Sequence, residues 1–315
     1  MKNRRSFIVG IKTTILLPKE KKFLNKYKPW GVILFSRNIK SIVQTKKLTD
    51  DIRKIFNDKK YPILIDQEGG RVSRLNNIIN SSNFTGEFFG KLFKKNIKKF
   101  NIYYQIFINQ TCHLLDKIGV NINTVPVLDV RRANSNNVIG DRSFSSNPKI
   151  VSKIGDFFIE HYQKNNIATV IKHIPGHGLA KVDSHKSTPI VKSKLKDLNK
   201  TDFLPFKKKK SLFAMTAHIV YQDIDKNFSA THSKKVIKFI RKKIKFRNLL
   251  ISDDISMKSL KFSIKENTLQ AFTAGCDLVL HCNAKYREMI VVARNSPKVN
   301  DFVSKKTSQF YKFLS

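Results

Sequence analysis

Between Lys172 and His185 the chain carries an unusual number of side chains that can donate or accept a proton. Lys172 and His173 follow a short apolar run, Ala168 to Ile171, which is typical of a buried strand. A Pro-Gly-His-Gly turn comes next, and the stretch closes with Asp183 and His185. A carboxylate beside an imidazole orients the ring and stabilises its protonated form. The spacing therefore predicts an acid/base pair on a loop that begins at a strand end.

On the residues alone, two other interpretations of this loop stay open. It could be an ordinary polar surface loop, or its side chains could bind a metal ion. The possible metal ligands are His173, His177, Asp183 and His185. Their spacing matches neither a helical HExxH motif nor a compact Cys/His cluster, so we expect no metal.

A second candidate for chemistry is the pair Asp253 and Asp254, which follows another apolar run in ISDDISM. A carboxylate at a strand end can attack an electrophilic carbon and form a covalent ester. The alternative role is to cap the N-terminus of the next helix. Because neighbouring side chains diverge, we expect one aspartate to cap and the other to react. Asp253 is nearer the strand, so we assign it as the nucleophile.

Charged residues after other apolar runs could hold a polar substrate. An aspartate can accept two hydroxyl hydrogen bonds, and an arginine donates several in a fork. The candidates are Asp66, Arg71, Arg74 and Arg142. Their alternative role is ordinary ion pairing, which we expect for Arg71 and Glu68 more than for Asp66. Gly69-Gly70 is a weak phosphate-loop candidate because no Gly-Lys-Ser/Thr follows it.

Eight short apolar runs that alternate with helical segments could position all these side chains. The runs lie at residues 6–11, 31–35, 61–66, 121–130, 168–171, 212–216, 248–254 and 276–283. Runs without polar alternation are typical of parallel strands buried on both faces. Eight such units in 315 residues predict a single (β/α)₈ barrel domain over residues 1–315. The alternative, a doubly wound sheet, usually has a Gly-rich phosphate turn after its first strand, and this chain has Gly10-Ile11-Lys12 there. In a barrel the strand ends meet at one rim, where the polar candidates would gather.

The composition is strongly basic, with a formal net charge of +38. That charge could indicate a binder of nucleic acid or anionic membranes, or a lysine-rich solvated surface. Lysines are spread over the whole chain, so we favour the surface and expect no specific nucleic-acid partner. The 3 cysteines form no CxxC pair, which favours reduced thiols. No run approaches the ~20 apolar residues of a membrane helix, and the first apolar run is too short for a signal peptide. We expect a cytoplasmic monomer that does not enter the membrane.

Six motifs occur in order between Gly31 and Asn283, and with them the chain resembles the family 3 glycoside hydrolases. The motifs are IDQEGGRVSRL, VIGDRSF, KHIPGHGLAKVDSH, MTAHIVY, ISDDISM and AGCDLVLHCN. Within that family they are similar to those of single-domain bacterial β-N-acetylhexosaminidases of cell-wall recycling. Asp141 stands where the family often has Glu.

The resemblance implies retaining hydrolysis of terminal β-linked N-acetylglucosamine (GlcNAc), without a metal or organic cofactor. The implied substrates are muropeptides that carry a GlcNAc-1,6-anhydro-N-acetylmuramic acid unit. Asp253 is implied as the nucleophile, His185 as the acid/base and Asp183 as its partner. The implied sugar-binding residues are Asp66, Arg74, Arg142, Lys172 and His173. Two alternatives remain: a family 3 β-glycosidase of other sugar specificity, such as a β-glucosidase, and a basic nucleic-acid-binding protein.

Overall fold

The structure is a computed structural model that describes residues 3–132, 137–180 and 187–314. Asp183 and His185 lie outside the described residues.

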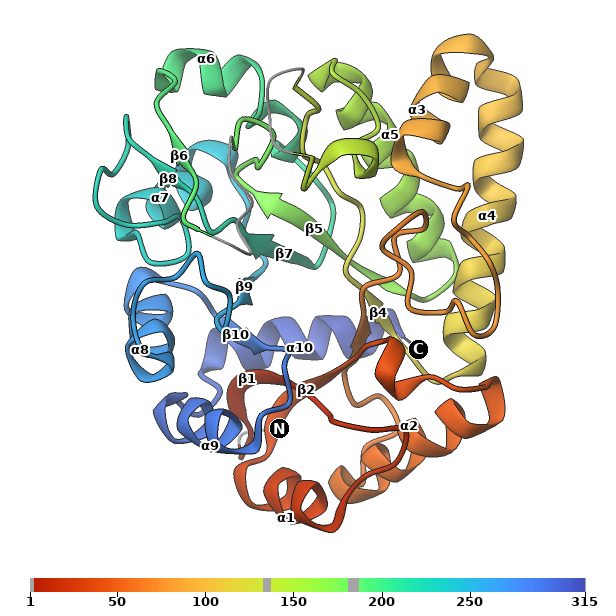
Figure 1. Cartoon of the computed structure of the whole chain (residues 1–315), viewed down its shortest axis with the longest axis vertical. Helices are drawn as coiled ribbons and strands as arrows, with labels where there is room; N and C mark the ends of the chain where they lie inside the picture. Colours follow the sequence, from red (N-terminus) through yellow and green to blue (C-terminus); the bar gives the residue numbers. More distant parts are fainter. Residues whose placement is uncertain (1–2, 133–136, 181–186, 315) are drawn as a thin grey trace.

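Within the described residues, eight parallel strands close into one barrel, in the order β1-β10-β9-β7-β5-β4-β3-β2. The strands are β1 (Arg5–Gly10), β2 (Pro29–Leu34), β3 (Ile63–Ile65), β4 (Ile122–Asn123), β5 (Ala168–Ile174), β7 (Phe213–Thr216), β9 (Leu249–Asp254) and β10 (Leu278–His281). Figure 1 shows the strands at the centre with helices around them. The predicted (β/α)₈ barrel is confirmed.

Ten α-helices lie in the described part of the chain, most of them between consecutive strands. They are α1 (Pro18–Tyr27), α2 (Ile42–Phe56), α3 (Gly86–Lys95), α4 (Ile97–Lys117), α5 (Pro148–Lys164), α6 (Leu195–Lys200), α7 (Lys234–Phe239), α8 (Ile264–Ala274), α9 (Tyr286–Asn295) and α10 (Asp301–Phe313). No helix among these residues is both long and apolar enough to span a membrane.

Three elements differ from the sequence predictions. β5 extends to Ile174, one residue beyond the predicted end at Lys172 and His173, and these two residues lie at the carboxyl end of the strand as expected. β4 is much shorter than the predicted run 121–130, since it ends at Asn123 and Pro126 follows, which has no N–H for a sheet ladder. The helical segment that follows Ser233 is not one regular helix, since α7 is followed by a π-helical turn, Ile240–Ile244.

Helix α10 covers the end of the barrel where the strands begin. Its residues Val303 and Phe310 are fully buried and pack in one cluster with the inward side chains of the strands. Trp30, at the start of β2, belongs to the same cluster and donates a hydrogen bond from Nε1 to Thr307 Oγ1 (2.8 Å). Each fully buried side chain of this size contributes roughly 1.5–3 kcal/mol to stability. These buried apolar side chains close this end of the barrel, so the polar side chains lie at the opposite rim.

A small ribbon lies outside the barrel, and the sequence did not predict it. It pairs β6 (Ile190–Val191) with β8 (Val220–Tyr221) in parallel. The ribbon holds the chain that follows residue 186 against the connection between β7 and α7 (Figure 1).

Candidate active site

Lys172 is the centre of a buried network of opposite charges at the carboxyl ends of the strands. Its side chain is 3% exposed. Its ammonium nitrogen lies 2.7 Å from Glu68 Oε1, 3.0 Å from Asp66 Oδ1 and 3.1 Å from Thr124 Oγ1. A cation this deeply buried is stable only with such partners. The position of Lys172 within β5 thus depends on two carboxylates supplied by the segment after β3.

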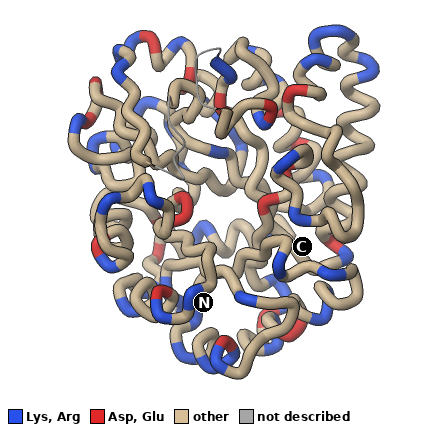
Figure 2. Tube along the Cα trace, viewed as in Figure 1, with Lys and Arg blue, Asp and Glu red and all other residues tan. Residues whose placement is uncertain are grey.

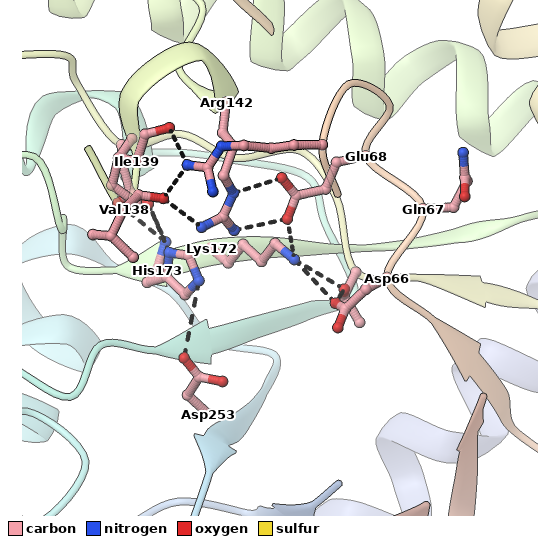
Figure 3. Close-up of polar contacts among 12 residues, drawn as sticks. Asp66, Gln67, Glu68, Val138, Ile139, Arg142, Lys172, His173 and Asp253 are labelled. Atoms are coloured by element: carbon pink, nitrogen blue, oxygen red, sulfur yellow. Dashed lines mark hydrogen bonds and ion pairs between the residues drawn. The ribbon is translucent and has the colours of Figure 1, made fainter. Parts of the chain in front are cut away.

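Two arginines complete the network from other segments. Arg142, in a short 3₁₀ turn (Gly140–Arg142), donates from Nε and Nη2 to the two oxygens of Glu68, each at 2.7 Å. This fork-to-carboxylate geometry is among the strongest of charged contacts. Arg74 lies on the other side, with Nη2 3.6 Å from Asp66 Oδ2. Figure 3 shows Glu68 between Arg142 and Lys172.

These contacts keep the carboxylates ionised. Burial favours the neutral form of Glu68, but the charges of Arg142 and Lys172 outweigh it and lower the pKa of this carboxyl to about 2. Burial likewise opposes ionisation of Asp66, and Lys172 and Arg74 outweigh it, so its pKa lies well below the ordinary value. The ammonium of Lys172 has a raised pKa because the attraction of Asp66 and Glu68 exceeds the cost of burial. All these groups are therefore charged at neutral pH.

His173 is oriented by Asp129, which has no exposed surface. Its Nδ1 lies 2.7 Å from Asp129 Oδ2, and Asp129 also accepts hydrogen bonds from the backbone N–H groups of His173 and His177. Burial by itself would raise the pKa of Asp129, but the neighbouring His173 and His177 lower it by more. The carboxyl is therefore ionised. Because Nδ1 of His173 lies beside an ionised carboxylate, it carries the hydrogen that it donates. With the ring held in this way, Nε2 lies 3.9 Å from Asp253 Oδ2.

Asp253 lies near the end of β9 with one oxygen held and the other facing the histidine. The backbone N–H of Asp254 donates to Oδ1 of Asp253 at 2.8 Å, and Oδ2 faces His173 (Figure 3). Burial opposes ionisation of Asp253, but the neighbouring His173 and His218 outweigh it and lower its pKa. The group is therefore a carboxylate at neutral pH.

The helix-cap role that we expected for one of the two aspartates is wrong. The N-cap of α8 is Ser263, whose hydroxyl accepts from the N–H of Glu266. Asp254 instead accepts hydrogen bonds from the backbone and the hydroxyl of Ser256 and from the backbone N–H of Cys282. It ties the end of β9 to its own loop and to the end of β10.

Six of the predicted site residues line one cavity of about 400 Å³ at the rim. They are Asp66, Arg74, Arg142, Lys172, His173 and Asp253. A cavity of this size falls within the range of small-molecule sites. Arg71 also lines it, but its Nε pairs with the partly exposed Asp141 at 3.0 Å, as expected for an ordinary ion pair.

Comparison with known proteins places this chain in a family. Residues 14–305 match the family model described as the glycosyl hydrolase family 3 N terminal domain. The chain is 35% identical over 283 residues to a beta-hexosaminidase of Hydrogenovibrio crunogenus, covering 88% of this chain and 78% of that protein. It is 34% identical over 265 residues to a beta-hexosaminidase of Nitrosomonas eutropha, covering 80% and 73%.

A solved structure of similar fold is NagZ from Neisseria gonorrhoeae in complex with N-trifluoroacetyl-D-glucosamine. The TM-score is 0.88 at 27% identity, over 99% of this chain and 90% of that one. This chain belongs to glycosyl hydrolase family 3. It is a glycosidase, an enzyme that hydrolyses O-glycosyl bonds.

The structure of this family 3 glycosidase adds two residues to the site that our sequence assignment left out. Glu68 was expected to make an ordinary ion pair, yet it holds both Arg142 and Lys172 in the cavity. Asp129 lies in the predicted run 121–130 and was given no role there, yet it fixes His173. The sequence feature that could have identified Glu68 is its position two residues after Asp66. Side chains two residues apart at a strand end point to the same side.

Gln67 illustrates that alternation. It points away from Asp66 and Glu68 (Figure 3) and is 3% exposed. Its Oε1 accepts hydrogen bonds from the backbone N–H groups of Arg74 and Leu75, at 2.8 and 3.2 Å. Gln67 therefore folds the loop back and brings the Arg74 side chain to the cavity.

The described residues contain no group of three or more His, Cys, Asp and Glu side chains placed to hold a metal ion. Two of the four possible metal ligands, Asp183 and His185, are not among those residues. The sugar-sized cavity instead offers carboxylates, cations and an oriented imidazole. These groups can accept hydrogen bonds from sugar hydroxyls and donate to sugar oxygens.

Proposed function

We propose that this family 3 glycosidase is a retaining exo-β-N-acetylglucosaminidase that releases terminal β-linked GlcNAc from muropeptides during cell-wall recycling. The names of its relatives support the sugar, since they are beta-hexosaminidases and a NagZ. One observation of the site supports the mechanism: the ionised Asp253 lines the cavity, with Oδ1 held by a backbone N–H and Oδ2 facing His173 Nε2.

In the first step we assign, Oδ2 of Asp253 attacks the anomeric carbon of GlcNAc. The glycosidic bond breaks, its electron pair stays on the leaving oxygen, and that oxygen takes a proton from the imidazolium of His185. In the second step a water molecule attacks the same carbon while His185 accepts a proton from it. The ester bond to Asp253 breaks, so the sugar leaves with its original anomeric configuration. Asp183 orients His185 in this proposal.

The remaining side chains bind the sugar. We assign hydroxyl recognition to Asp66, Lys172 and His173, which present a carboxylate, an ammonium and an imidazole to the cavity. Arg74 and Arg142 act beside them, each paired with a carboxylate of the same network. Because Glu68 and Asp129 already neutralise and orient these groups, little reorganisation is needed when a sugar enters.

We further propose that residues 1–315 act as one catalytic domain in the cytoplasm. The three cysteines are free thiols, which is the usual state in a reducing compartment. Lysines and arginines are distributed around the molecule (Figure 2), which supports a solvated basic surface over a single nucleic-acid-binding stripe.

The test is hydrolysis of a fluorogenic β-N-acetylglucosaminide by the wild type and Asp253→Ala. We expect turnover by the wild type and a loss of several orders of magnitude in the variant. Equal rates would remove the nucleophile assignment. A faster reaction with the matching β-glucoside would favour a family 3 enzyme of other sugar specificity. Release of GlcNAc from a purified muropeptide tests the natural substrate.

A further inference from the structure

His218 is a buried imidazole to which the mechanism above gives no role. It lies two residues after the end of β7, and the residue is 1% exposed. Its Nε2 lies 3.0 Å from the carbonyl oxygen of Asp254, and its Nδ1 lies 2.7 Å from Oγ1 of Thr231. Both ring nitrogens therefore have a partner inside the protein, and the orientation of the ring is fixed.

The hydrogen positions on this ring follow from its two partners. A backbone carbonyl can only accept a hydrogen bond, so Nε2 of His218 carries a hydrogen and donates it to Asp254. Burial lowers the pKa of His218, so the ring is neutral at neutral pH. Nδ1 then carries no hydrogen and accepts one from the hydroxyl of Thr231. Thr231 in turn accepts from Oγ1 of Thr216 at 2.8 Å, so each contact in this chain has one donor and one acceptor.

The carbonyl that His218 holds belongs to the residue that holds the proposed nucleophile. The backbone N–H of Asp254 donates to Oδ1 of Asp253 at 2.8 Å. On the side of β10, the carboxylate of Asp254 accepts a hydrogen bond from the backbone N–H of Cys282 at 3.2 Å. Because β9 lies between β7 and β10 (Figure 1), Asp254 needs a second contact, on the side of β7, to be held from both sides.

His218 supplies the contact on the side of β7. The paired residues of β7 and β9 run to Met215 and Ile251, three residues before Asp254. The ring of His218 reaches beyond that point to the carbonyl of Asp254. Hydrogen bonds on both sides limit the rotation of the Asp254 backbone, and this rotation sets the direction of the N–H that faces Asp253. A displacement of about 1 Å at a reacting group can lower a rate roughly 100-fold.

We propose that His218 is a positioning residue of the hydrolysis, which acts through Asp254 to hold the carboxylate of Asp253 in line with the anomeric carbon. This inference rests on the proposed function, because it takes Asp253 as the nucleophile. It goes beyond that function by adding a residue that touches neither the sugar nor the reacting atoms. The described residues that line the active-site cavity do not include His218. Its contribution is therefore to kcat and not to the affinity for the substrate.

Two substitutions of His218 separate its two contacts. In His218→Gln the side-chain amide lies about where Nε2 lies, so the hydrogen bond to Asp254 is kept and the contact with Thr231 is lost. In His218→Asn the amide lies about where Nδ1 lies, so the contact with Thr231 is kept and the hydrogen bond to Asp254 is lost. A purely structural role through Thr231 and a positioning role through Asp254 thus predict opposite orders of activity for the two variants.

The experiment measures kcat and KM on a fluorogenic β-N-acetylglucosaminide, with kcat divided by the folded fraction from near-UV circular dichroism. We expect His218→Asn to lower kcat about 100-fold with KM within about twofold of the wild type. For His218→Gln we expect kcat within about threefold of the wild type, since the hydrogen bond to Asp254 remains. The matched control is His281→Gln, at a buried histidine that ends β10 and pairs with Glu288, and its kcat should not change.

The reverse order would overturn the inference, because a higher kcat in His218→Asn than in His218→Gln would give the ring a role through Thr231 alone. Equal kcat values in the two variants, whether high or low, would overturn it too. A raised KM with unchanged kcat would instead make His218 a substrate-binding residue. If His218→Asn does not fold, His218→Gln decides alone, since a retained kcat supports the inference and a lost one refutes it.

Asp253→Ala, measured in the same series, separates this inference from the proposed function. Wild-type turnover in Asp253→Ala would remove the nucleophile assignment, and the positioning role with it. An inactive Asp253→Ala beside a fully active His218→Asn would leave the proposed function intact and remove only the role of His218.

Discussion

Replacing Glu68 by Gln tests whether the charge network holds the site together. Glutamine keeps the size of the side chain but removes the charge that faces Arg142 and Lys172, both at 2.7 Å. The side chains of all three residues are 11% exposed or less. Two buried cations would then face a neutral amide. Removing one partner of a buried ion pair is costly because it leaves the other charge buried without compensation.

The magnitude follows from the pKa of Glu68, which is lowered from 4.5 to about 2. That difference of about 2.5 pKa units corresponds to ~3 kcal/mol of folding free energy contributed by the ionised form. The folded-state pKa is depressed, so this contribution is fully present above pH 4.5 and is lost as the pH falls toward 2. We expect Glu68→Gln to cost ~3 kcal/mol at pH 7 and only about 1 kcal/mol at pH 3.

The assay is urea unfolding of the wild type and the variant at pH 7, 5, 4 and 3, followed by circular dichroism. Glu160→Gln is the matched control, since Glu160 forms an exposed i,i+4 pair with Lys164 and should change stability very little. Equal stability of the wild type and Glu68→Gln at pH 7 would refute the reasoning. A stability difference that stays constant down to pH 3 would refute the linkage to ionisation.

Three further predictions concern activity on a fluorogenic GlcNAc substrate. Asp129→Asn removes the charge that fixes His173 and should lower kcat/KM about 10- to 100-fold, the effect of one charge-assisted hydrogen bond, while Asn at the exposed Asp223 should not. Asp66→Asn should lower kcat/KM by a similar factor, chiefly through KM, and a change in kcat alone would contradict a binding role. Because the pKa of Asp253 is lowered below 3.8, kcat/KM should not fall between pH 7 and 5 from loss of the nucleophile, and an acid limb centred above pH 5 would contradict this.

The fold could be predicted from the sequence because each barrel strand is a short run of apolar residues followed by polar ones. A parallel strand that is buried on both faces needs such an apolar run, and eight runs separated by helical segments fit few folds other than the (β/α)₈ barrel. The failures are local. The strand was expected to end at Lys172 and His173 because charged residues rarely lie within a buried strand, yet β5 continues to Ile174. Contacts with Asp66 and Asp129 from other segments make the burial of these two residues stable.

The candidate site was predictable in its members but not in their connections. Asp66, Lys172 and Asp253 follow or end apolar runs, which marks them in the sequence. The role of Glu68 depends on Arg142, 74 residues away, and nothing in the local pattern states that pairing. The β6–β8 ribbon was missed for the same reason, since two-residue strands leave no periodicity to read.

The central claim is that Asp253 forms a covalent bond to the sugar, and trapping that ester tests it most directly. The wild type and Asp253→Ala would each be incubated with a 5-fluoro N-acetylglucosaminyl fluoride, quenched, digested and measured by mass spectrometry. We predict one added sugar on the wild-type peptide that contains Asp253, and none on the variant. A sugar attached to a different carboxylate, or turnover with inversion of the anomeric configuration and no adduct, would contradict the mechanism.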